Sequence, residues 1–171
     1  MKIFIYAAIA LLTACSGVSS NIQSAPAGDI QLKQVVTGVE TYMGTTVRWG
    51  GKIISISNYE TYSSLQIVQF PLNRYGRPIA DRHSQGRFIS QSKNFLDPEI
   101  YQEGTMVTFV GTVSAEETIK VDQKTLTLPV IDIIDSHLWI DKYSGTNREY
   151  NPKHDAPFVG YGYYGTGYYS P

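Results

Sequence analysis

Residues 47–56 read Val-Arg-Trp-Gly-Gly-Lys-Ile-Ile-Ser-Ile, and their apolar pattern indicates a bent β-strand. Trp49 lies on one face of an alternating strand, whereas Ile54 lies on the opposite parity, so the apolar phase slips across Gly50-Gly51. A β-bulge at the glycine pair restores one continuous buried face and bends the strand sharply. Because small closed barrels need such bends at their corners, the stretch predicts a β-barrel.

After this strand, apolar and polar residues continue to alternate with a period of two as far as Ile140. Arg48 is expected to point into solvent, opposite the buried Trp49. Residues 71–86 read as a loop, Asp122-Gln123-Lys124 as a hairpin turn, and Pro129 implies an edge or a bulge. Further strands are predicted at 64–70, 87–91, 105–115, 118–121, 125–134 and 137–140.

Two helical elements accompany these strands. A helix with Asp29 as its N-cap is expected to end at Gly44, and its apolar positions are Leu32, Val35, Val36, Val39 and Met43. A single turn within 97–104 is expected to plug one end of the barrel with Phe95, Leu96, Ile100 and Tyr101. The fold class is therefore mostly β: a small OB-like β-barrel with one N-terminal helix and a short inserted helical turn.

The first fifteen residues predict a targeting signal. Lys2 precedes the apolar run 3–12, which is shorter than the roughly 20 residues of a membrane-spanning helix and fits a secretory signal peptide. Leu12-Thr13-Ala14-Cys15 resembles the lipobox of bacterial lipoproteins, in which diacylglycerol is attached to the cysteine sulfur. The alternative is an ordinary signal peptide with a chance cysteine at its cleavage site. Because the chain has one cysteine, the lipoprotein reading is favoured.

These features divide the chain into four segments. Residues 1–14 are the predicted lipoprotein signal peptide, and residues 15–28 the lipidated cysteine and a flexible tether. Residues 29–143 form the barrel domain. Residues 144–171, which end in a Tyr/Gly run, are predicted to be a disordered tail.

Five motifs carry a family resemblance in this order along the chain. They are Val47-Arg48-Trp49-Gly50-Gly51, Gly86-Arg87-Phe88, Phe95-Leu96-Asp97-Pro98-Glu99-Ile100-Tyr101, Val107-Thr108-Phe109-Val110-Gly111 and His137-Leu138-Trp139. Together with the lipobox, they resemble the Slp family of outer-membrane lipoproteins, the starvation-inducible lipoproteins of Gram-negative bacteria. The resemblance implies an outer-membrane anchor and a role in starvation or envelope stress, and it implies no catalytic or binding residue.

Destination and partners follow from the anchor. Ser16 stands where lipoproteins of the inner membrane often carry Asp, so the outer membrane is expected, with the domain facing the periplasm. The expected partner is outer-membrane lipid through Cys15, with an envelope glycan or protein as a further candidate. With 14 Lys+Arg against 15 Asp+Glu, nucleic-acid binding through bulk charge is not expected.

No catalytic centre is predicted. The chain lacks the motifs of common hydrolases and nucleotide-binding proteins, and its three histidines (His83, His137 and His154) are scattered, so no metal or cofactor is expected. The acid pairs Glu116-Glu117 and Asp132/Asp135 are poor acid/base candidates, because adjacent hairpin residues point to opposite faces. A non-enzymatic structural role is expected; the alternatives are a carbohydrate- or envelope-component-binding OB-like module and, less favoured, a small enzyme.

Charge is distributed unevenly. Residues 74–93 hold five bases and one acid, and residues 97–141 hold nine acids and two bases. One hypothesis is that Arg74, Arg77 and Arg82 contact anionic envelope material. The favoured alternative is that their loop folds against the acidic strands. The Tyr/Gly tail either stacks on glycan or protein or is inert.

Overall fold

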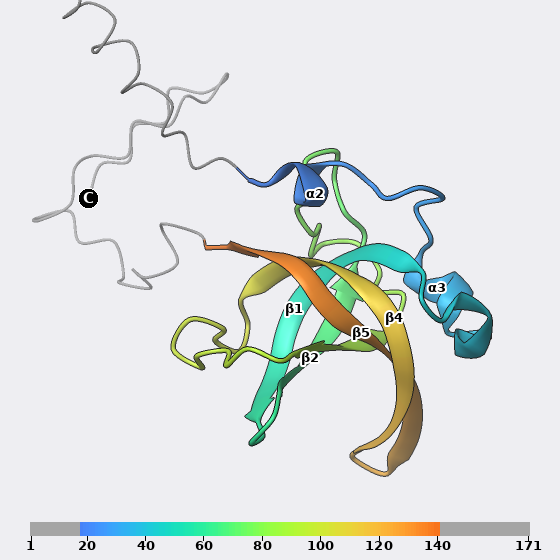
Figure 1. The fold of residues 1–171 in the computed structure, drawn as a ribbon, viewed down its shortest axis with the longest axis vertical. Coiled ribbons are helices and arrows are strands. Elements are labelled where there is room, and N and C mark those ends of the chain that lie inside the picture. Colours follow the sequence, from blue (N-terminus) through green and yellow to red (C-terminus); the bar gives the residue numbers. More distant parts are fainter. Residues whose placement is uncertain (1–17, 141–171) are drawn as a thin grey trace, which may run out of the picture. The chain divides into compact units, whose positions relative to one another are not determined.

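Five strands close into a barrel in the order β1-β2-β3-β5-β4, within the residues 18–140 that this computed structural model describes (Figure 1). All neighbouring strands are antiparallel except β3 and β5, which are parallel. This order and a mostly-strand composition confirm the predicted OB-like fold class. The strands are β1 (Thr46–Asn58), β2 (Ser63–Phe70), β3 (Arg87–Ser92), β4 (Met106–Val121) and β5 (Lys124–Trp139).

Strand β1 bends so that it pairs with β4 along its first half and with β2 along its second half. The bend passes through Gly51, where an added Cβ would lie 1.9 Å from the carbonyl oxygen of Val68, so only glycine fits. The predicted bulge at the glycine pair is wrong in position. The register instead shifts between Ile53 and Ser55. Ile53 therefore keeps the inward phase of Trp49, and Ile56, after the shift, also packs against the core.

The second half of the sheet has fewer and longer strands than predicted. The ranges 105–115 and 118–121 merge into β4, and 125–134 and 137–140 merge into β5, because two register shifts absorb the changes of phase. Pro129 pairs with Glu116 of β4 just before β3 begins to pair at Val130, so it stands where the other edge of β5 is unpaired, as predicted.

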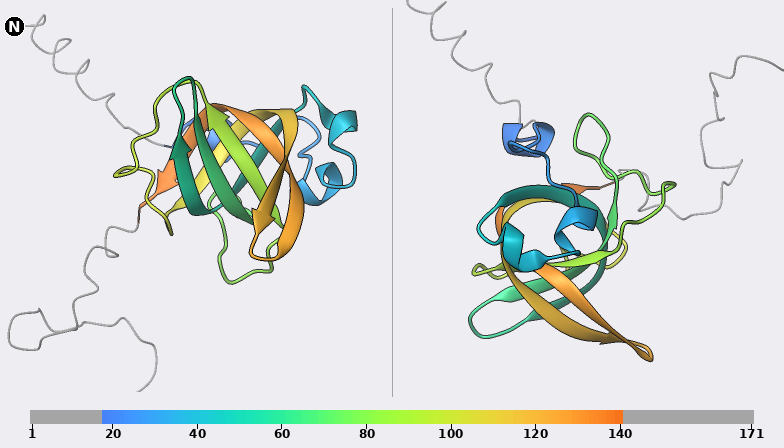
Figure 2. Two further views of the ribbon diagram at one scale, coloured as in Figure 1. Left: turned by 90° about the horizontal axis from the view of Figure 1, so that it is seen from below. Right: turned by 90° about the vertical axis from the view of Figure 1, so that its right-hand side faces the viewer.

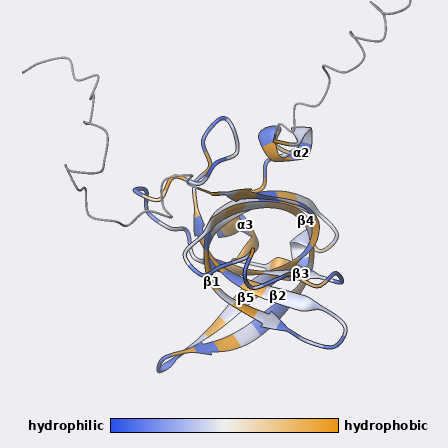
Figure 3. Ribbon diagram, turned by 90° about the vertical axis from the view of Figure 1, so that its left-hand side faces the viewer, coloured by the Kyte–Doolittle hydropathy of each residue, from blue (hydrophilic) through white to orange (hydrophobic). Residues whose placement is uncertain are grey.

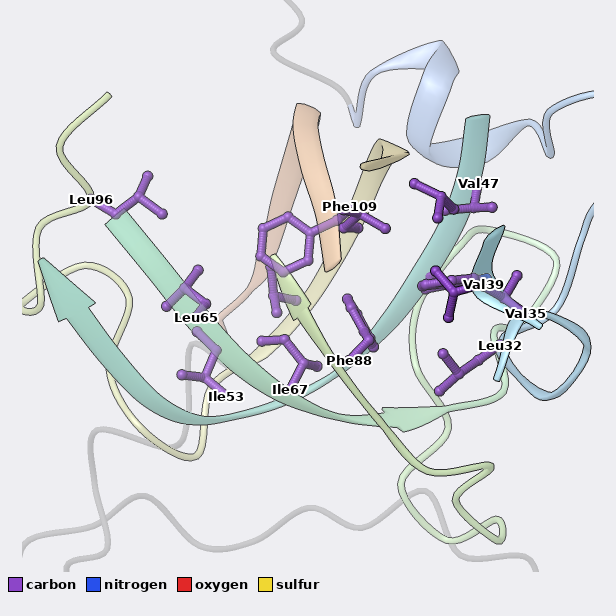
Figure 4. Close-up of a cluster of buried hydrophobic side chains, with 14 residues drawn as sticks. Leu32, Val35, Val39, Val47, Ile53, Leu65, Ile67, Phe88, Leu96 and Phe109 are labelled. Carbon is purple, nitrogen blue, oxygen red and sulfur yellow. The ribbon is translucent and has the colours of Figure 1, made fainter. Parts of the chain in front are cut away.

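The core fills the barrel from end to end (Figure 4). Phe88 lies at its centre, edge-on to Trp49 at 5.3 Å and to Phe109 at 6.5 Å between ring centroids. Figure 3 shows hydrophobic and hydrophilic residues interspersed along the strands of the barrel. Trp49 is 1% exposed, which confirms it as a core anchor.

Two segments close the ends of the barrel. Leu32, Val35 and Val39 seal one end, and Leu96 lies at the other (Figure 4). Tyr101 packs against the core, but Phe95 and Ile100 are 71% and 55% exposed, so half of the predicted plug is solvent-facing. Asp97 does cap a single turn, because its carboxylate accepts the Glu99 N–H at 2.9 Å.

The predicted N-terminal helix is divided. It comprises α3 (Leu32–Val35) and the 3-10 turn η1 (Val39–Tyr42), separated by an extended Gly38. Its N-cap is Gln31, which forms a reciprocal capping box with Gln34, rather than Asp29. Glycine and β-branched valines are poor helix formers, so packing of the buried aliphatic side chains determines the local shape.

Beyond the barrel, β4 and β5 continue together as a two-stranded arm, residues 114–129 (Figure 2). At its base, Leu128 and Val130 bury Ile89 on the outside of β3 in a small second apolar cluster. The arm is therefore fixed to the barrel by packing as well as by strand pairing.

Several predicted features lie outside the described residues: the signal peptide 1–14, Cys15 and the tail 144–171. Between residues 18 and 140, no helix is long and apolar enough to cross a membrane.

Candidate functional site

The outer surface of the barrel has two opposite sides, which we call the closed wall and the open wall. The closed wall is the outside of β1, β4 and the end of β5, covered by α2 (Ser20–Gln23) and residues 71–80. The open wall is the outside of β2, β3 and residues 130–132, flanked by the β1–β2 loop (59–62) and the arm. Figure 2 shows α2 on one side of the barrel and both flanking hairpins on the other.

On the closed wall, α2 is held by one arginine and one isoleucine. The guanidinium Nη1 of Arg48 donates to the carbonyl oxygens of Ile22 at 2.9 Å and Gln23 at 2.7 Å. Ile22 is fully buried. Arg48 therefore does not point into solvent as predicted, because its charge satisfies the carbonyls of a helical turn.

Residues 71–80 are fixed to the same wall through Thr108. The Thr108 hydroxyl, fully buried, donates to the carbonyl oxygen of Gly76 at 2.6 Å and accepts from the Trp139 indole N–H at 2.9 Å. Gly76 has φ of 82°, and an added Cβ would lie 2.3 Å from the Ile22 carbonyl oxygen. The loop and α2 thus pack backbone to backbone, a contact that glycine alone permits.

This packing differs from the flexible tether predicted for residues 15–28. The Ser19 hydroxyl donates to the Asp135 carboxylate at 2.5 Å, and Ile22 is buried under the loop. Ile22 is a large apolar side chain in a polar segment, and that was the signal available in the sequence. Residues 19–23 therefore belong structurally to the barrel.

The open wall contains a cavity of about 680 Å³. It lies where β3 ends and β5 diverges, beneath the β1–β2 loop. Its lining is mainly neutral and polar, with one aromatic side chain and one charge of each sign. The lining residues are Thr61, Tyr62, Gln91, Ser92, Lys93, Asn94, Asp132 and Ile133.

An aromatic pair forms the rim of this cavity. Tyr59 and Tyr62 stack with their ring centroids 4.6 Å apart and their planes at 26°. Tyr59 is 56% exposed, so one ring face of the pair remains open to solvent. The two tyrosines are close in the sequence, but the residues that complete the cavity come from strands far apart in the chain, so the site was not predicted.

A second hollow of about 450 Å³ continues the open wall toward the arm. Arg87 lies in it, with Nη1 donating to Gln66 Oε1 at 3.4 Å, and Leu126 and Leu128 of the arm line its other side. The two hollows lie near opposite ends of β3, the first beside Gln91 and the second beside Arg87.

The three arginines proposed for anion contact occupy different settings. Arg74 is exposed and donates to the Tyr75 hydroxyl at 2.5 Å, with its guanidinium carbon 4.6 Å from that ring's centroid. Arg77 lies over the Trp139 ring at 5.9 Å. Arg82 is exposed in the segment leading to β3. The anion contact stays a prediction for these residues.

The acids considered for catalysis are not brought together. Asp132 faces the open-wall cavity, whereas Asp135 accepts from Ser19 on the closed wall, and Glu116 and Glu117 lie exposed on the arm. His137 packs edge-on against Trp139 at 4.4 Å. Residues 18–140 contain no group of three His, Cys, Asp or Glu side chains placed to hold a metal ion.

Comparison with protein families finds one match along nearly the whole chain. The Outer membrane lipoprotein Slp family matches residues 12–168. Among curated relatives, Outer membrane protein Slp of Escherichia coli is 36% identical over 109 residues, covering 63% of this chain and 57% of that protein. The chain thus spans a little over half the length of that relative. The uncharacterized lipoprotein YeaY of Escherichia coli is 28% identical over 169 residues, covering 94% of this chain and 85% of that protein.

Among solved structures, the mitochondrial single-stranded DNA binding protein Rim1 of S. cerevisiae has a TM-score of 0.36 and 16% identity. The alignment covers 56% of this chain and 95% of that one.

Proposed function

The chain belongs to the Outer membrane lipoprotein Slp family, and from that premise we propose an outer-membrane lipoprotein, anchored through Cys15, whose barrel binds an envelope carbohydrate. The barrel acts in the periplasm as a non-enzymatic module, in a role linked to starvation or envelope stress. Its signal peptide ends at residue 14.

The anchor rests on the lipobox Leu12-Thr13-Ala14-Cys15. Each buried methylene of an acyl chain contributes about 0.8 kcal/mol, so diacylglycerol and a further acyl group such as palmitate hold the protein stably in a bilayer. Mass spectrometry of the N-terminal peptide tests this directly: the mature chain should begin at an acylated Cys15. An unmodified cysteine, or membrane association that survives Cys15→Ala, would contradict the anchor.

The carbohydrate proposal rests on the 680 Å³ cavity of the open wall. Its size lies within the range of small-molecule sites. Amide and hydroxyl side chains such as Gln91, Ser92 and Asn94 donate and accept hydrogen bonds, as sugar hydroxyls require. The Tyr59/Tyr62 stack adds a flat apolar face against which a sugar ring packs. OB-type barrels use this side, between the corresponding strands and loops, for oligosaccharides and oligonucleotides.

Charge favours a glycan over a nucleic acid. Lys93 and Asp132 bring one base and one acid to the cavity, which leaves no continuous basic track for phosphates. A binding role is also favoured over catalysis, since Asp132 has no second carboxylate beside it in the cavity lining.

Calorimetric titration of the full chain with soluble peptidoglycan fragments, and separately with lipopolysaccharide core oligosaccharide, tests the site. Gln91→Ala and Tyr62→Ala should each weaken binding about tenfold, since each removes about 1.4 kcal/mol of contact. Lys120→Ala, on the exposed face of the arm, is the matched control and should bind as the native chain does. If neither probe binds, or all three variants bind equally, the open wall is not a glycan site.

A further inference from the structure

The barrel is joined to Cys15 by a much shorter link than the sequence suggests. Residues 19–23 are fixed to the closed wall by buried Ile22, by Arg48 and by the Ser19–Asp135 hydrogen bond. Val18 is therefore the last residue before the wall, three residues from Cys15. Three residues span at most about 11 Å, compared with the root-mean-square reach of roughly 20 Å of a free tether of 13 residues.

A link of this length decides which side of the barrel meets the membrane. The headgroup layer on each side of a bilayer is about 5–7 Å thick, so most of the link is used in crossing it. The closed wall, where the link ends, then has to lie at the headgroups. The open wall lies on the opposite side of the barrel (Figure 2) and faces away from the lipid.

We infer that the closed wall is a docking surface for the anionic phospholipid bilayer that holds the Cys15 lipid, with Arg74 and Tyr75 inserted among the headgroups. This inference rests on the proposed anchor. The result is a barrel that lies on the membrane in one orientation.

The chemistry of the closed wall suits this partner. The covering segments, 18–28 and 71–80, hold Arg74 and Arg77 and no acid. The acids beside them are Asp29, which lines a small hollow with Arg48 and Pro71, and Asp135, whose carboxylate accepts from the Ser19 hydroxyl. Gly76 packs against the Ile22 backbone, so the loop tip that carries Arg74 and Tyr75 lies beside the point where the link ends. Tyr75 is 55% exposed, and the exposed Arg74 guanidinium donates to its hydroxyl. Tyrosine and arginine are the side chains that membrane interfaces favour, because each joins an apolar body to a polar end.

The tips of the loop and arm on the opposite side carry a net negative charge. The β1–β2 loop and the arm hold Glu60, Glu116, Glu117 and Asp122 against Lys120 and Lys124. An anionic surface repels these tips and attracts the exposed Arg74 of the closed wall, so electrostatics and chain length favour the same orientation.

The test uses the full lipidated chain in vesicles of phosphatidylethanolamine and phosphatidylglycerol. A single added cysteine carries a fluorescent label, either on α2 (Ser20→Cys) or on the β1–β2 loop (Thr61→Cys); both sites are exposed. A quencher attached to lipid headgroups reports proximity. Quenching should be several-fold stronger at position 20 than at position 61.

Two variants separate the link from the surface. About twelve Gly/Ser residues inserted between Gly17 and Val18 add roughly 20 Å of reach, and should bring the quenching ratio close to one. Arg74→Glu should lower the ratio a few-fold in vesicles with phosphatidylglycerol and not in neutral ones, whereas Lys120→Glu should leave it unchanged.

The outcomes distinguish the two proposals. If the N-terminal peptide is acylated but positions 20 and 61 are quenched equally, the docking surface is overturned and the anchor stands. If the peptide carries no acyl group and the protein does not associate with vesicles, the anchor fails and the docking inference fails with it. A ratio unchanged by the Gly/Ser insert also overturns the short link as its cause.

Discussion

The closed and open walls are built from the same sheet and differ in what covers them. On the closed wall, Thr108 is fully buried under backbone that comes from outside the sheet, whereas on the open wall Gln91 stays half-buried at a cavity. Covering a strand face requires partners for its polar groups, and Gly76 and Ile22 supply carbonyl oxygens to Thr108 and Arg48. The polar groups of the closed wall are used in contacts that stabilise the fold, whereas those of the open wall remain available to a ligand.

Among the substitutions on the closed wall, Gly76→Ala should lower the free energy of unfolding most. The added Cβ would lie 2.3 Å from the Ile22 carbonyl oxygen, and the residue would hold φ of 82°. Left-handed strain and the clash together should lower the free energy of unfolding by about 3 kcal/mol or more, measured by urea denaturation of the full chain. Gly104→Ala is the control, because φ is 87° and nothing lies within 4 Å of its added Cβ. It should cost only about 1–2 kcal/mol. Equal losses would mean that the loop and α2 do not depend on this contact.

Ile22→Ala should destabilise the same wall by about 3 kcal/mol, because a fully buried isoleucine leaves a cavity. The change also releases the segment before it, so amide hydrogen exchange of residues 19–23 should rise toward that of a free peptide. Ile100→Ala, at a site 55% exposed, is the control and should change the free energy of unfolding by less than about 0.5 kcal/mol. A loss for Ile22→Ala as small as that of the control would contradict docking of α2.

Thr108→Val should lower the free energy of unfolding by about 2 kcal/mol. The substitution keeps the shape but leaves the Gly76 carbonyl oxygen and the Trp139 N–H without their partner inside the wall. Thr118→Val on the exposed arm removes a 3.3 Å contact to Thr127 and should change stability by less than about 0.5 kcal/mol. Similar values for the two valine variants would argue that Thr108 has no special role in holding the loop.

Gln91→Ala, on the open wall, should have the smallest effect on the free energy of unfolding. Its side chain lines an open cavity, so the free energy of unfolding should change by less than about 0.5 kcal/mol. Glycan affinity should still fall about tenfold. A stability loss near that of Thr108→Val would show that the open wall, too, is structural.

The sequence predicted the barrel because its signal is local. Alternation along Val107, Phe109 and Val113 and the bend near Gly51 follow from period and glycine content, and both reappear in the structure. Bulge positions were less predictable. The shift falls at Ile53/Ser55 rather than at Gly50-Gly51, because Gly51 is needed for the approach of Val68 and not for a change of phase.

The contacts that form the two walls could not be predicted from the sequence. Burial of Ile22 depends on Gly76 and Arg48, which lie 54 and 26 residues away, and no local period connects them. The tyrosine pair and its cavity likewise join the β1–β2 loop to the ends of β3 and β5. The lipobox, in contrast, is a contiguous motif, so Cys15 was found by reading alone.

The parallel contact of β3 with β5 has a consequence for the order of folding. It consists of three residue pairs, Ile89–Val130, Ser90–Ile131 and Gln91–Asp132, each separated by 41 residues, whereas β4 and β5 join through a two-residue turn. Loop closure over that distance costs entropy, so we expect this three-pair joint to form after the β4–β5 hairpin. Gln91 and Asp132, from the two sides of the joint, both line the open cavity. A ligand bound in this cavity contacts both strands and stabilises the closed barrel. Amide exchange along β3 should therefore be slower when the cavity is occupied.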